Sequence, residues 1–118
     1  MNNFNQAVLE GFLTADPDLK VVSGGSQVCN FTIGSNRSYT KKDGERVEEA
    51  AFFDITTWNA TAQACGKFLK KGARVLVGGN LRRDVWKTKE GQTRSKVYLE
   101  GREVEFLSPK AAHGERPI

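Results

Sequence analysis

The chain has 118 residues, which suits a single domain with a modest hydrophobic core. It carries a formal net charge of +4, two cysteines without the spacing of a zinc motif, and one histidine, His113, near its C-terminus. Because no Walker-type phosphate loop, signal peptide or long apolar span is visible, the composition argues against an enzyme, a metal or cofactor site and a membrane protein, and favours a cytoplasmic protein.

Short strand-like runs, separated by turn residues, occupy the first half of the chain. Residues 7–13 alternate in polarity and end near Asp16-Pro17-Asp18, which is expected to break the strand. A second run covers residues 28–34 and a third covers residues 52–58. Between them, Lys-Lys-Asp-Gly at residues 41–44 is typical of a hairpin turn.

The periodicity changes in the next segment. Residues 59–71 carry apolar side chains at helical spacing and no proline, which predicts a short helix. Asn59 is its expected N-terminal cap, and Gly72 is its expected C-terminal cap.

Two further extended segments follow, residues 73–86 and 93–107, and residues 87–92 join them as a hairpin. Five extended segments with one short helix between the third and the fourth match the order of the all-β, five-stranded OB barrel. We therefore predict an OB-fold domain over residues 1–108 and a short flexible tail over residues 109–118.

Alternation of side chains assigns a face to each residue of the third run. The expected core residues are Phe53 and Ile55. The expected solvent-facing residues are Phe52, Asp54, Thr56 and Trp58. Two large rings on a polar face suggest a binding surface.

The fourth run is assigned in the same way. Its expected inner residues are Val75, Val77, Gly79 and Leu81. Its expected outer residues are Arg74, Asn80, Arg82 and Trp86. A bulge near Gly78 and Gly79 would change this parity.

The two cysteines are predicted to be structural. Cys29 shares strand parity with Phe31 and Ile33, so it is expected in the core, and Cys65 falls in the predicted helix. We expect free thiols in a reducing compartment, with a disulfide as the alternative.

Aromatic and basic side chains together indicate a partner. Four rings lie in strand-like stretches beside basic residues: Tyr39, Phe52, Trp58 and Trp86. From Lys67 to Lys96 ten basic residues face two acidic ones, Asp84 and Glu90, a local balance of +8. Rings that stack on bases beside cations that bind phosphates favour a nucleic acid. The alternative is that the rings cover loops or an oligomer contact.

The chain resembles the bacterial single-stranded DNA-binding proteins over roughly positions 3 to 107. The matching elements are Val8-Leu9-Glu10-Gly11-Phe12-Leu13 with Asp16-Pro17, Asn30-Phe31-Thr32-Ile33 through Asn36-Arg37-Ser38-Tyr39, Phe52-Phe53-Asp54-Ile55-Thr56-Thr57-Trp58, Phe68-Leu69-Lys70-Lys71-Gly72, Gly79-Asn80-Leu81-Arg82 through Trp86, and Glu103-Val104-Glu105-Phe106-Leu107.

This resemblance implies an OB fold that commonly forms a homotetramer and coats single-stranded DNA, without sequence choice, in replication, recombination and repair, in the cytoplasm at the nucleoid. It assigns base stacking to the four rings. The residues expected to track phosphates are Arg37, Lys41, Lys42, Arg82, Lys87, Lys89, Arg94 and Lys96. An OB-fold RNA-binding protein and a replication-accessory interaction module are the alternatives.

The C-terminal segment departs from the family pattern. Family members usually end in a flexible linker and an acidic tip that docks replication and repair proteins. After Leu107 this chain has one acid, Glu115, and no acidic cluster. Recruitment of partners through this segment is therefore not expected.

Overall fold

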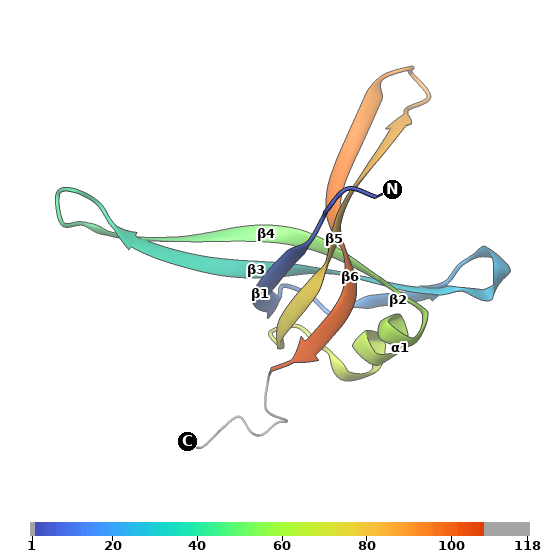
Figure 1. The fold of residues 1–118 in the computed structure, drawn as a ribbon, viewed down its shortest axis with the longest axis horizontal. Helices are drawn as coiled ribbons and strands as arrows, with labels where there is room; N and C mark the ends of the chain where they lie inside the picture. The colour runs from blue at the N-terminus through green and yellow to red at the C-terminus, as the bar shows by residue number, and fades with distance from the viewer. Residues whose placement is uncertain (1, 108–118) are drawn as a thin grey trace.

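The computed structural model describes residues 2–107, which form one barrel with projecting hairpins (Figure 1). Its elements in chain order are β1 (Ala7–Leu13), β2 (Asp18–Val21), a 3-10 turn (Ser23–Gly25), β3 (Gln27–Thr40), β4 (Arg46–Trp58), α1 (Asn59–Phe68), β5 (Arg74–Lys87) and β6 (Thr93–Phe106).

The barrel closes through five strands. β1 pairs with β5 on one side and with β3 on the other, and β5–β6, β6–β4 and β4–β3 pairings complete the circle. With α1 between the third and fourth barrel strands, this is the predicted five-stranded OB barrel.

β2 is a strand that the sequence did not reveal. Its four residues, Asp-Leu-Lys-Val, are all exposed; they alternate in polarity, but the run is short and directly follows Asp16-Pro17, where a strand was expected to break. It exists because it pairs along the outer edge of β3, where Leu19 lies opposite Cys29.

The core fills the barrel and continues under the helix. Ile33, Ile55, Val75, Val77 and Leu99 are at most 1% exposed. Alternation on β3, β4, β5 and β6 puts these side chains on the inner face, as predicted for Ile55, Val75 and Val77.

Both cysteines lie in this core as free thiols. Cys29 and Cys65 are fully buried, and Phe31 and Ile33 belong to the same cluster. Burial raises the pKa of Cys65 to about 11 and also raises the pKa of Cys29. The thiols therefore behave as small apolar groups.

The helix ends differ from the expected caps. Asn59 starts α1 with a φ of +53°, and its Oδ1 accepts a hydrogen bond from the Gln27 N–H at 3.1 Å rather than capping the helix. The helix ends at Phe68, and Gly72 lies beyond it in a turn, where its N–H donates to the Leu13 carbonyl at 2.8 Å. Contacts with β3 and β1 thus engage the two groups that the predicted caps would have used.

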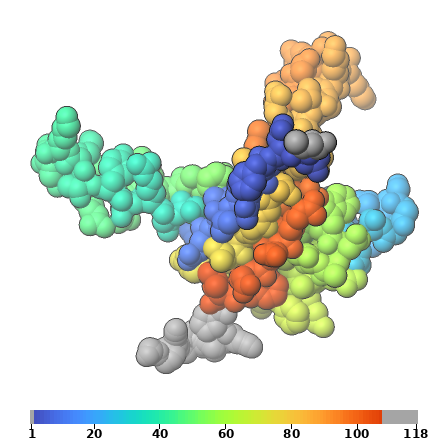
Figure 2. Space-filling view, viewed as in Figure 1, coloured from blue at the N-terminus to red at the C-terminus, as the bar shows by residue number. Residues whose placement is uncertain are grey.

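The β3–β4 and β5–β6 hairpins extend beyond the barrel, as does the shorter β2–β3 hairpin, and the space-filling view shows them standing clear of its body (Figure 2). We call residues 35–51 the β3–β4 arm and residues 82–98 the β5–β6 arm. β3 and β4 pair in an unbroken register from Val28 opposite Trp58 to Thr40 opposite Arg46. The β5–β6 ladder instead shifts register between Gly78 and Gly79.

The departure of the arms explains two wrong assignments. Phe53 and Leu81 were expected in the core, but they are 37% and 48% exposed. Each has inner parity, but each lies where its strand leaves the barrel, so there is no opposite wall to cover it. Parity gives the direction of a side chain, and only the curvature of the sheet decides whether it is buried.

Within residues 2–107, no helix has the length and apolar character needed to cross a membrane. Among these same residues, no three His, Cys, Asp or Glu side chains lie close enough together to hold a metal ion.

Candidate nucleic-acid interface

The outer face of β3 and β4 carries rings at its ends and polar groups between them. Four cross-strand pairs form successive rows of this face, which we call the β3–β4 face: Gly34 with Phe52, Thr32 with Asp54, Asn30 with Thr56, and Val28 with Trp58. Phe52 is 62% exposed and Trp58 is 40% exposed. Six residues of extended strand place these rings about 20 Å apart.

The polar floor between the rings is held by short hydrogen bonds. The Thr32 hydroxyl donates to Asp54 Oδ1 at 2.7 Å, and the Thr56 hydroxyl donates to Asn30 Oδ1 at 2.7 Å. Asp54 Oδ2 lies 3.4 Å from Nζ of Lys96, which reaches over from β6. The floor is therefore ordered before any ligand arrives.

A groove follows this floor. It has a volume of about 260 Å³, and its lining includes Thr14 and Asp16 on one flank and Lys96 on the other. An open groove with a polar floor and rings at its ends suits an extended chain of planar groups better than a compact small molecule.

Trp86 belongs to the same surface. On the β5–β6 arm it pairs with Arg94, and it shares its face with Lys96, which pairs with Asp84. Because Lys96 contacts Asp54, the face of the arm that carries Trp86 adjoins the β3–β4 face. The indole is 46% exposed, and a guanidinium group lies directly across the ladder from it.

Tyr39 lies on the other face of the β3–β4 hairpin. It pairs with Val47, and the unbroken register gives this pair the opposite orientation from the Gly34–Phe52 pair. The Tyr39 hydroxyl donates to Glu49 Oε2 at 3.1 Å, and the Arg37 guanidinium carbon lies 4.8 Å from the ring centroid. The structure thus groups Phe52, Trp58 and Trp86 and separates Tyr39 from them.

The basic residues predicted to bind phosphates divide between the two arms. On the β3–β4 arm, Arg37 pairs with Glu49 at 3.9 Å, and Lys41 pairs with Glu45 at 3.4 Å. Lys42 lies in the turn at the tip of this arm, without an ion pair among residues 2–107.

On the β5–β6 arm, Arg82 pairs with Glu100 at 3.1 Å. Lys87, Lys89 and Arg94 form no ion pair within residues 2–107, and Arg94 instead donates to the Gln92 side-chain oxygen at 2.8 Å. This arm therefore offers three cations that no carboxylate of the described residues neutralises: Lys87, Lys89 and Arg94.

Tyr98 lies on the same arm, opposite Arg82. Burial of its hydroxyl is the main cause that raises the pKa of Tyr98, and the Asp84 carboxylate raises it further.

One ring was overlooked in the sequence. Phe12 of β1 pairs with Gly34, so it extends the first row of the β3–β4 face by one strand. Alternation in β1, which buries Gly11 and Leu13, placed Phe12 on the outer parity together with Val8 and Glu10. That signal was available in the alternation of residues 7–13, but no face was assigned to Phe12 from the sequence.

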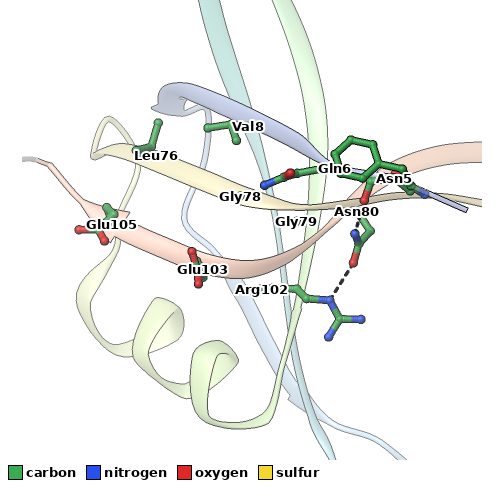
Figure 3. A pocket seen from close by; sticks show the side chains of 11 residues that line it. Asn5, Gln6, Val8, Leu76, Gly78, Gly79, Asn80, Arg102, Glu103 and Glu105 are labelled. Carbon is green, nitrogen blue, oxygen red and sulfur yellow. Dashed lines mark hydrogen bonds between the residues drawn. The ribbon is translucent and has the colours of Figure 1, made fainter. Parts of the chain in front are cut away.

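The outer face of β1, β5 and β6 has a different character. A hollow of about 540 Å³ is lined there by Val8, Leu76, Arg102, Glu103 and Glu105, among others (Figure 3). Figure 3 also shows how the N-terminal segment is attached, because Arg102 Nε donates to Asn80 Oδ1 at 2.8 Å and the Asn80 amide donates to the Asn5 carbonyl. The carboxylates of Glu103 and Glu105 make the outer face of β1, β5 and β6 a poor site for phosphates.

Comparison with known proteins agrees with this fold. The Single-strand binding protein family matches residues 4–107. The chain is 33% identical to Single-stranded DNA-binding protein 2 of Chlorobaculum tepidum, over 98% of this chain and 78% of that protein. It is 40% identical to the Single-stranded DNA-binding protein of Treponema pallidum, over 91% of this chain and 60% of that protein.

Among solved structures, a Plasmodium falciparum SSB in complex with ssDNA superposes with a TM-score of 0.82 at 24% identity, covering 91% of this chain and 97% of that one. At this identity the likeness concerns the fold. The match of the family to nearly all the described residues is decisive, and the chain belongs to the single-strand binding protein family.

Proposed function

We propose that this protein binds single-stranded DNA without sequence preference and holds it open and protected during replication, recombination and repair. The observation that carries the proposal is the placement of three exposed rings, Phe52, Trp58 and Trp86, on one surface beside a basic arm. Relatives that match most of the chain are named for the same ligand.

The rings supply contact without sequence choice. Every base has a π-face, so a stacked base is worth roughly 1–3 kcal/mol whatever its identity. In our proposal Phe52, Trp58 and Trp86 stack bases along the groove, and Tyr39 stacks a base on the other side of its hairpin.

The cations supply long-range attraction to the backbone. Lys87, Lys89, Arg94, Arg82 and Lys96 bind phosphates on the β5–β6 arm. Arg37, Lys41 and Lys42 contribute less, because carboxylates on their own arm compete with the phosphates. Binding of this kind makes and breaks no covalent bond, so the protein is not an enzyme.

We further propose that the protein acts as a homotetramer in the cytoplasm, at the nucleoid. The outer face of β1, β5 and β6 supports self-association, because Phe4 is 89% exposed and Val8 is 57% exposed beside a hollow of about 540 Å³. Light scattering with and without a long oligo-dT would report both assembly and stoichiometry. The predicted tail over residues 109–118, with its expected lack of partner recruitment, lies outside the described residues.

The test is a titration with oligo-dT, oligo-U and duplex DNA. We expect Trp58→Ala to weaken oligo-dT binding by roughly 1–3 kcal/mol without lowering the melting temperature much. Phe68→Ala is the control, because this ring is 61% exposed but lies at the end of α1. Duplex affinity equal to that for oligo-dT would contradict the proposal, and tighter binding of oligo-U would favour an RNA ligand instead.

A further inference from the structure

Phe12, Gly34 and Phe52 form one row across three strands. Phe12 pairs with Gly34 in the β1–β3 ladder, and Gly34 pairs with Phe52 in the β3–β4 ladder. Residues paired in this way present their side chains on the same face of the sheet. The row is therefore ring, glycine, ring, on the outer surface.

Both rings lean over the glycine. A Cβ atom at Gly34 would lie 2.8 Å from Phe12 Cζ and 3.1 Å from Phe52 Cε1. The two rings thus occupy the room that the missing side chain leaves, and they converge above the same backbone atoms. The result is an aromatic platform two rings wide, where a side chain at residue 34 would have held them apart.

The platform adjoins the groove of the β3–β4 face. The next row along the same strands contains Thr32 and Asp54, and Thr14, two residues after Phe12, lines the groove with them. Phe12 therefore lies in the same row as Phe52, at the end of the groove. Phe12 is half-buried, so one part of the ring packs on the sheet and another part remains accessible.

We propose that Phe12 is a fifth base-contacting ring, and that it forms with Phe52 a platform on which the base at this end of the groove is seated. This proposal rests on the function proposed above and adds a residue to its binding site. An aromatic ring is required at position 12 for this role. A purely structural cover for Gly34 would need only an apolar side chain of similar size.

The first test separates these roles with Phe12→Leu. Leucine keeps apolar cover over Gly34 and removes the π-face, so we expect a nearly unchanged melting temperature and at least about fivefold weaker binding of oligo-dT. Phe12→Trp keeps a ring and should bind at least as tightly as wild type. Phe68→Leu removes an exposed ring of α1 and should leave binding unchanged. Wild-type affinity in a folded Phe12→Leu variant would overturn the proposal.

A second measurement does not depend on the stability of the leucine variant. In a Trp58→Phe, Trp86→Phe background, Phe12→Trp introduces the single indole, and saturating oligo-dT should quench its fluorescence. Phe68→Trp in the same background should not be quenched. If the indole at position 12 responds to protein concentration and not to DNA, the ring lies in a contact between copies and the proposal fails. Failure of wild type to bind oligo-dT would instead refute the proposed function itself.

Discussion

The two hairpin arms have the same architecture and different charge. The β3–β4 arm contains four basic and four acidic residues, and two of its cations are paired within the arm. The β5–β6 arm contains six basic and two acidic residues. A polyanion is therefore attracted mainly to the second arm, whereas the first neutralises itself. A long hairpin can present a ring to DNA, but its charge decides how strongly it attracts the backbone.

The arms also leave the barrel in different ways. The β3–β4 ladder continues in register into its arm, so the barrel sheet simply extends. The β5–β6 ladder has an irregularity at Gly78 and Gly79, where a Cβ atom at Gly79 would lie 1.9 Å from the Glu100 carbonyl oxygen. The direction of the basic arm thus depends on a backbone contact that only glycine permits.

The largest effect is expected from Gly79→Ala. Backbone must move to accept the methyl group, so we expect a loss of stability at or above the upper end of roughly 1–3 kcal/mol, together with weaker DNA binding. Gly44→Ala is the matched control at the tip of the other arm, where φ is +90° and the space is open. It should cost only the local strain of roughly 1–2 kcal/mol. Thermal melts and oligo-dT titrations would show whether the two glycines differ.

Removing one ring from each arm is the next comparison. Trp86→Ala should weaken oligo-dT binding by roughly 1–3 kcal/mol, because the indole faces the groove surface beside Arg94. Tyr39→Ala should cost less, because its hydroxyl is engaged by Glu49 on the opposite face of its hairpin. Equal losses in the titrations would mean that DNA follows both faces of the β3–β4 arm.

Salt dependence tests the charge of each arm directly. We expect Lys87→Gln combined with Arg94→Gln to make the slope of log K against log salt shallower by about 1.4, at about 0.7 for each lost phosphate contact. The pair Lys41→Gln and Lys42→Gln removes the same charge from the neutral arm and should change the slope less. Titrations at four or more salt concentrations give both slopes. A larger change for the second pair would reverse the roles of the arms.

The smallest effect is a gain. Glu49→Gln removes the carboxylate that contacts both Arg37 and Tyr39, and it leaves the β3–β4 arm with a net positive charge. DNA affinity should rise by less than about 1 kcal/mol, as for other exposed ion pairs, and the gain should disappear at high salt. A loss of affinity at low salt would show that Glu49 orders Tyr39 for binding.

Much of the fold could be predicted from local patterns. The barrel strands, the helix and the hairpin turns each have a periodicity or turn residues of their own, and the order of elements then identified the OB barrel. β2 escaped because its alternating run is only four residues long and directly follows a predicted strand-breaking turn at Asp16-Pro17. The caps at Asn59 and Gly72 were wrong because contacts with β3 and β1 engage the Asn59 Oδ1 and the Gly72 N–H, the groups that local capping would have used.

For the site, the sequence determined which side chains are available: four rings, a basic second half and outer parity for Phe52 and Trp58. Only the tertiary structure decided which of them meet. Parity within one strand says nothing about where two strands diverge, so Phe53 and Leu81 became exposed and Tyr39 fell on the far face. The row of Phe12, Gly34 and Phe52 joins residues forty positions apart, because closure of a barrel brings strands together through pairings that no local pattern encodes.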